Sequence, residues 1–273
     1  MLQLISDKEQ SLKEFTENNY AQASFFWHIL LKNKEIKVNG VKVGKDTTLY
    51  KGDVVSYYLT KKQEEKPAFY TVYEDEKVLL VDKESGVNSE AVFAALSRQR
   101  ECYFIHRLDR NTRGLMIFAL DSKTETALLH AFKERRIEKV YHALCFGRFD
   151  KDEGVLQSYL RKDERNALVK IFDKPTDGAE KIITEYKVLA QNAETAKVEV
   201  ILHTGKTHQI RAHLAHIGHP LVGDMKYGIS ERNKALQISR QCLVAKALRF
   251  SLEDELKYLN GKIFNSRFEA ELL

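Results

Sequence analysis

A short polar stretch between two apolar runs is the feature that most constrains the fold. Residues 106–114 read His-Arg-Leu-Asp-Arg-Asn-Thr-Arg-Gly and separate the apolar residues 103–105 from the apolar residues 115–120. Such runs are typical of core strands, and the polar residues between them favour a turn. We therefore expect Asp109 to lie on a short loop that core strands hold at both ends, where a rigid frame would fix its carboxylate.

The charge of this loop allows two interpretations of Asp109. Three arginines, Arg107, Arg110 and Arg113, crowd the same stretch. Positive charge favours an ionised carboxylate and an anionic partner, which is typical of a catalytic site. Alternatively, the aspartate braces its own turn and the arginines are solvated. The stretch by itself leaves both interpretations open.

A second polar stretch, residues 203–220, contains five histidines and two basic residues, Lys206 and Arg211. We expect a helix here that Thr207 caps and Gly218 ends, with Arg211 at the margin of its apolar face. The histidines invite a metal interpretation. However, no carboxylate or cysteine accompanies them in the helix, and the two basic residues would oppose a cation. We predict no metal site.

The composition is that of an ordinary globular protein of 273 residues, with 43% hydrophobic and 30% charged residues and a net charge of +5. Charged residues throughout the first twenty positions exclude a secretory signal there, and no apolar run is long enough to cross a bilayer. The cysteines form no Cys-x-x-Cys pair, so we expect neither disulfides nor zinc binding. They are Cys102, Cys145 and Cys242. We expect a cytoplasmic protein with no membrane partner.

The first sixty residues predict a small α+β unit. Ser11 and Glu14 are spaced for a capping box, the apolar residues 25–31 predict a second helix, and Asn39-Gly40 between valines predicts a hairpin. Lysines stand around the hairpin: Lys32, Lys34 and Lys37. Residues 61–67 are polar and end in a proline, which is typical of a linker.

Three motifs, in order along the chain, resemble the RluA-type pseudouridine synthases. Residues 106–115 resemble H-R-L-D-x-x-T-S/T-G-L, residues 139–147 resemble K-x-Y-x-A-L/V-x-x-G, and residues 204–228 resemble T-G-R/K-T-H-Q-I-R followed by G-H-P-L-x-G-D-x-x-Y-G. A fourth match is weaker, because Glu84 stands where the family motif K-P-x-G has proline. Arg113 likewise replaces a small hydroxyl residue.

This resemblance implies roles for particular residues. Asp109 corresponds to the nucleophile of the family, Arg211 to the arginine that pairs with it, and Tyr141 to the tyrosine beside the target base. Arg107 corresponds to a residue that helps to fill the space left by a flipped nucleotide. The resemblance implies an α+β fold with a mixed, mainly antiparallel central sheet, flanking helices and a central cleft. It implies no cofactor.

The order of the amino-terminal lysines, Val-Asn-Gly and Gly-Asp-Val resembles an S4-type RNA-binding domain, and the alternative is a generic α+β domain with a solvated lysine face. We therefore expect an S4-like domain at 1–60, a linker at 61–67 and a catalytic domain at 68–273. The expected partner is RNA, with ribosomal RNA favoured over transfer RNA, and the expected state is a monomer. A catalytically silent RNA-binding protein is the competing class; a glycoside hydrolase would need a second, paired carboxylate.

Overall fold

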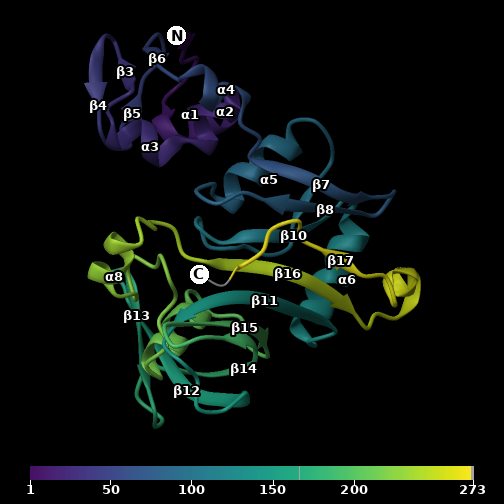
Figure 1. The fold of residues 1–273 in the computed structure, drawn as a ribbon. Helices are drawn as coiled ribbons and strands as arrows, with labels where there is room; N and C mark the ends of the chain where they lie inside the picture. Colours follow the sequence, from purple (N-terminus) through teal and green to yellow (C-terminus); the bar gives the residue numbers. More distant parts are fainter. Residues whose placement is uncertain (166, 272–273) are drawn as a thin grey trace.

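A computed structural model describes residues 1–165 and 167–271, the side chain of Asp254 excepted. Figure 1 shows a small amino-terminal unit joined to a larger unit that is built on one long sheet. The two units are in contact, because α1 and α2 of the first pack on α5 of the second. No helix in the described part of the chain is both long and apolar enough to cross a membrane.

The amino-terminal unit encloses its own hydrophobic core between short helices and a small antiparallel sheet of order β1-β6-β3-β4. Asn39 and Gly40 both have positive φ, as a two-residue hairpin turn requires, so the predicted hairpin is confirmed. Ser11 caps α1 by accepting the Glu14 N–H at 3.0 Å. The elements are β1 (Leu2–Ile5), β2 (Gln10–Ser11), α1 (Leu12–Asn19), α2 (Ala21–Phe25), α3 (Trp27–Lys32), β3 (Ile36–Val38), β4 (Val41–Val43), β5 (Thr48–Leu49) and β6 (Val54–Tyr57).

Two local features of this part of the chain were not predicted. The first strand, β1, was not predicted, because residues 2–5 gain their strand partner only by pairing with β6, some fifty residues later. The segment 61–67 contains a five-residue helix, α4 (Lys61–Glu65). Thr60 and Gln63 form a reciprocal capping box at its amino terminus. Capping therefore gives this polar connection a defined backbone.

The larger unit is an 11-stranded mixed sheet in the described residues. Its main order is β13-β12-β14-β15-β11-β16-β10-β8-β7, and every pairing is antiparallel except that of β10 with β16. The predicted mixed, mainly antiparallel sheet is confirmed. The strands are β7 (Phe69–Glu74), β8 (Val78–Lys83), β9 (Tyr103–Phe104), β10 (Arg113–Ala119), β11 (Ile137–Phe146), β12 (Glu153–Asp163), β13 (Leu168–Phe172), β14 (Glu180–Gln191), β15 (Thr195–Leu202), β16 (Leu243–Phe250) and β17 (Phe264–Asn265).

Helices cover both faces of the sheet where it supports the central loop. On β10, Met116 and Phe118 pack into the cluster that contains α5 and α7 residues, whereas Leu115 and Ile117 pack into the cluster that contains α6 residues. A strand buried on both faces has to be apolar at consecutive positions, which explains the unbroken apolar run after the loop. The helices are α5 (Ser89–Ser97), α6 (Ser122–Lys133), α7 (Gln209–His216), α8 (Ser230–Ala235) and the 3₁₀ helix η1 (Asp254–Leu259).

The central loop, residues 105–112, connects β9 to β10, as the sequence predicted. Gly114, the second residue of β10, follows the loop and pairs with Ala245 at the one parallel junction of the described sheet. Gly114 has φ of +115°, and a Cβ placed there would lie 2.3 Å from the Ala245 carbonyl oxygen. Only glycine permits this approach, so Gly114 fixes where the loop leaves the sheet.

Replacing Gly114 with alanine should therefore be costly. The methyl group would meet backbone rather than a movable side chain, and we expect a loss of about 3 kcal/mol or more in the free energy of unfolding. Gly52→Ala is the matched control, because Gly52 also has positive φ (+94°) but a Cβ placed there would have nothing within 4 Å. That variant should lose only about 1–2 kcal/mol. Equal losses in urea denaturation of the two variants would contradict this explanation.

Candidate active site

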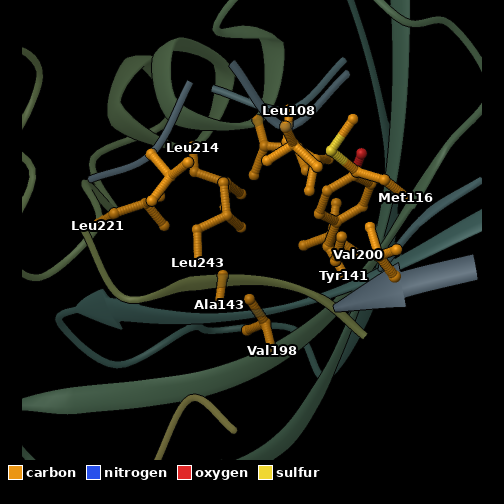
Figure 2. Close-up of a cluster of buried hydrophobic side chains, with 14 of the residues drawn as sticks. Leu108, Met116, Tyr141, Ala143, Val198, Val200, Leu214, Leu221 and Leu243 are labelled. Atoms are coloured by element: carbon orange, nitrogen blue, oxygen red, sulfur yellow. The ribbon is translucent and has the colours of Figure 1, made fainter. Parts of the chain in front are cut away.

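The loop that carries Asp109 is anchored on both sides of that residue. Leu108 is buried in the core cluster shown in Figure 2. Its backbone N–H donates to Ser89 Oγ at 3.0 Å, and Ser89 Oγ donates to its carbonyl at 2.9 Å. Beyond Asp109, the Thr112 N–H donates to the Asp109 carbonyl, and Thr112 Oγ1 accepts from Gln241 at 2.7 Å. The backbone of Asp109 is thus held in place.

The Asp109 side chain is paired with Arg211. Arg211 Nη1 donates to Asp109 Oδ2 at 2.8 Å, while Nε and Nη2 donate to Asp224 at 2.7 and 2.9 Å. The bidentate Asp224 pair fixes the plane of the guanidinium and leaves Nη1 to donate to Asp109. Within the described residues, Asp109 Oδ1 accepts no hydrogen bond. One carboxylate oxygen is therefore held and the other is available.

The charges in this cluster are stable because they are paired. Burial opposes ionisation of Arg211, but the carboxylates of Asp224 and Asp109 outweigh it and raise the pKa of the guanidinium above its ordinary value. Burial likewise opposes ionisation of Asp224, and hydrogen bonds from Arg211 lower the pKa of that carboxyl below its usual range. Asp224 was not predicted as a site residue, although it stands in the third motif.

His208 also lies beside Asp109, with Nε2 3.8 Å from Asp109 Oδ2. Its Nδ1 is 2.9 Å from the Tyr227 hydroxyl, which accepts the Val169 N–H. Burial lowers the pKa of His208, so the ring favours its neutral form. The prediction that Thr207 caps α7 is wrong: His208 occupies the N-cap position, with left-handed backbone (φ +56°) and no side-chain capping bond.

Tyr141 reaches the same cavity from β11. A bulge between Val140 and Tyr141 shifts the register so that Tyr141 pairs with Ala245, the residue that also pairs with Gly114. Burial, and then the negative charge of Asp109, raise the pKa of Tyr141, so its hydroxyl keeps its proton at neutral pH. The three predicted catalytic residues are thus brought together.

These residues line one cavity of about 300 Å³, which opens to the surface. This volume lies at the lower end of the range of small-molecule sites, which is about 300–1,000 Å³. It is lined by His106, Arg107, Leu108, Asp109, Thr112, Lys139, Tyr141, Leu202, Gly205, Lys206, Thr207, His208, Gln209, Ile210, Arg211 and Leu243. No group of three or more His, Cys, Asp or Glu side chains is placed to hold a metal ion in the part of the chain that the structure describes.

Lys83, for which no role was predicted, is fully buried below the loop. Its Nζ donates to the carbonyls of Glu84, Val87 and Arg110 at 3.0, 2.9 and 3.2 Å. Burial lowers its pKa to about 7. The three carbonyls nevertheless match the three N–H groups of an ammonium, so this side chain ties β8 to the catalytic loop. Burial of a lysine cannot be read from sequence.

The other predicted residues lie at different distances from this cavity. Arg107 lines it and pairs with Glu90 at 2.9 Å, whereas Arg110 is exposed and contributes its carbonyl to Lys83. The amino-terminal lysines belong to the small unit and do not line it. They are Lys32 and Lys34, which are exposed, and Lys37, whose ammonium lies over the Tyr58 ring.

Arg113 makes internal contacts instead of pointing to the cavity. Its Nε lies 3.5 Å from Glu84 Oε2, and its guanidinium lies over the Phe268 ring. Glu84 and Arg113 both depart from the family pattern. In the structure these two residues contact one another. Glu84 also donates its N–H to the Ala68 carbonyl at 2.9 Å, which proline could not do.

Comparison with known proteins identifies the family. The sequence profile of the family described as RNA pseudouridylate synthase matches residues 64–216. This chain belongs to that family. The RluA-type resemblance of the motifs is confirmed, and the synthase is an RNA-modifying isomerase.

Two relatives and one solved structure illustrate the match. The synthase is 31% identical over 230 residues to ribosomal large subunit pseudouridine synthase C of Vibrio cholerae, covering 73% of this chain and 70% of the relative. It is 32% identical over 206 residues to tRNA pseudouridine synthase C of Vibrio parahaemolyticus, covering 66% and 83%. The structure of human RNA pseudouridylate synthase domain containing 1 aligns with a TM-score of 0.60 at 25% identity, covering 72% of this chain and 88% of that one.

The contact between Glu84 and Arg113 can be tested with a double-mutant cycle. Glu84→Gln and Arg113→Gln should each destabilise the synthase, and the double variant should lose less than the sum. We expect a coupling of about 1 kcal/mol, since Glu84 is buried and the Arg113 side chain is partly exposed. The control cycle uses the exposed Lys61–Glu65 pair, which should show almost no coupling. If the losses of stability in the Glu84 and Arg113 variants were simply additive, the contact between the two side chains would not stabilise the synthase.

His106 should make stability depend on pH. Its Nε2 accepts the Ile117 N–H at 3.1 Å, and burial lowers its pKa to about 3, below the 6.5 or so of an unfolded histidine. The folded chain therefore binds fewer protons, and the stabilisation present above about pH 6.5 is lost as the pH falls toward 3. Between pH 6.5 and 4.5, the wild type should lose about 1–2 kcal/mol more than His106→Gln. If the stability of the wild type and of His106→Gln changed equally with pH over this range, His106 would not be the source of the pH dependence.

Proposed function

We propose that this synthase converts uridine to pseudouridine in structured RNA with Asp109 as its nucleophile. The observation that carries the proposal is the pairing of Asp109 with Arg211, which keeps the carboxylate oriented and leaves its Oδ1 available in the cavity. A carboxylate acts as a nucleophile through a free oxygen, and the guanidinium of Arg211 holds only the other oxygen of Asp109.

The reaction moves one bond of the nucleoside. The bond from ribose C1′ to uracil N1 breaks, the uracil turns, and C1′ bonds to C5 instead. C5 loses its hydrogen as a proton and N1 gains one, so no oxidant or external group is needed. Asp109 attacks either C1′ or C6 to begin this sequence. Tyr141 keeps its hydroxyl proton, so it would pack on the base and position C5 rather than take the C5 proton as a base.

The target uridine has to leave its stack to enter the cavity, at a cost of a few kcal/mol. Arg107 is suited to fill the vacated space, because it lies at the cavity and 68% of its side chain is exposed. Its pairing with Glu90 gives it an alternative partner when no RNA is bound. This division of roles follows the family resemblance and the position of each side chain.

We further propose that residues 1–60 form an S4-like RNA-binding domain in which Lys32, Lys34 and Lys37 contact phosphates. Ribosomal RNA is the favoured target, and the ribosomal large subunit name of the V. cholerae relative supports it. Transfer RNA is the alternative, which the name of the V. parahaemolyticus relative supports. Mapping pseudouridines in RNA from cells with and without the gene distinguishes them.

The nucleophile is tested by Asp109→Asn. The amide cannot form the covalent bond, so we expect tritium release from RNA labelled at uridine C5 to fall at least about a thousandfold. Folding and RNA binding should be preserved. Asp177→Asn, at an exposed turn outside the cavity, is the control and should retain activity. Normal turnover by Asp109→Asn would refute the mechanism, and a wild-type protein that releases no label would point to a silent RNA-binding protein.

A further inference from the structure

A second cavity of about 290 Å³ adjoins the active-site cavity. The two share four lining residues, Lys139, Leu202, Gly205 and Lys206. The second cavity extends from these residues to the end of α6 and the turn that leads into β11. Any polymer whose reactive unit occupied the first cavity could place an adjacent unit in the second.

The second cavity carries positive charge that the protein does not neutralise. Three of its cations, Lys133, Arg135 and Lys139, form no ion pair with any carboxylate of the described residues. The other two charged residues of the lining are paired, Lys206 with Glu180 and Glu138 with Arg249. The His203 ring also has a carboxylate partner, Glu185.

Lys139 lies at the junction of the two cavities. Burial lowers its pKa, and its ammonium lies 5.7 Å from the centre of the Phe132 ring without a counter-charge. A Cβ at Gly205 would lie 2.9 Å from Lys139 Nζ, so the absence of a side chain at 205 leaves room for the ammonium. An anion at this junction would offset the cost of burying the charge.

Arg135 occupies a backbone position that glycine would fill more easily. It has φ of +59° at the end of α6, where the Arg136 N–H donates to the Ala131 carbonyl at 2.8 Å. This is the left-handed residue of a helix-terminating turn. An arginine here carries a conformational cost and, among the described residues, makes no ion pair in return, but it does add a cation to the cavity wall.

We propose that this second cavity binds the backbone phosphate of a nucleotide next to the target uridine. The inference rests on the proposed function, since it takes the uridine to occupy the first cavity. The two cavities share one wall, so an RNA strand whose uridine enters the first cavity brings its adjoining phosphate to the second. This favours RNA over a free anion as the ligand. Lys133 and Arg135 contact the phosphate from the α6 turn, and Lys139 contacts it from the junction.

The test separates binding from stability. Arg135→Gly and Lys133→Ser remove cations outside the active-site cavity, and the double variant should raise KM for an unmodified large-subunit ribosomal RNA transcript about fivefold to tenfold with kcat unchanged. The slope of log binding constant against log salt should fall by about 1, as expected for one lost phosphate contact. Arg135→Gly should melt at the same temperature as the wild type or higher, because glycine suits its backbone.

Lys257→Ser is the control, since Lys257 is an exposed lysine of η1 that lines neither cavity. It should leave KM and the salt slope unchanged. The proposal is overturned if the double variant matches this control, or if kcat falls while KM stays the same. If the wild type binds this transcript but makes no pseudouridine, the proposed function fails on that RNA, and the salt slope of binding still decides whether the cavity takes a phosphate.

Discussion

A buried guanidinium between two carboxylates holds the active site together. Asp224 is fully buried and accepts from Nε and Nη2 of Arg211, while Nη1 donates to Asp109. The cluster joins three segments that are far apart in sequence: the β9–β10 loop, helix α7 and the turn after it. Without Asp224 the guanidinium would lose the pair that fixes its plane, and without Arg211 the two carboxylates would lose the cation that they share. The pairing therefore sets the direction of the Asp109 carboxylate.

The sheet makes this cluster possible because it is rigid under the loop. β10 is buried on both faces, and its first residues meet β16 at the parallel junction where only Gly114 fits. Tyr141 pairs with the same residue, Ala245, from the other side. A single position on β16 thus pairs with both the start of β10 and Tyr141, and a densely packed interior compresses little, so their separation is fixed.

The chain departs from the family pattern without losing this frame. Glu84 and Arg113 lie at the end of β8 and the start of β10, and they contact each other across the two strands. Lys83 holds the loop from below through three backbone carbonyls. Each departure considered alone weakened the match to the family motifs. Together they support the same backbone segment.

Local patterns were enough to predict the strand–loop–strand frame around Asp109 and the Asn39-Gly40 hairpin, because apolar runs and turn residues act on their own neighbours in the chain. The motifs, through the family resemblance, added the mixed sheet and selected Asp109, Tyr141 and Arg211. Folding itself created the rest: the burial of Lys83 and Asp224, the position of His208, the strand β1 and the uncompensated charge around Lys139. These features depend on contacts between residues far apart in the chain, and burial and charge pairing are properties of that arrangement rather than of any short stretch.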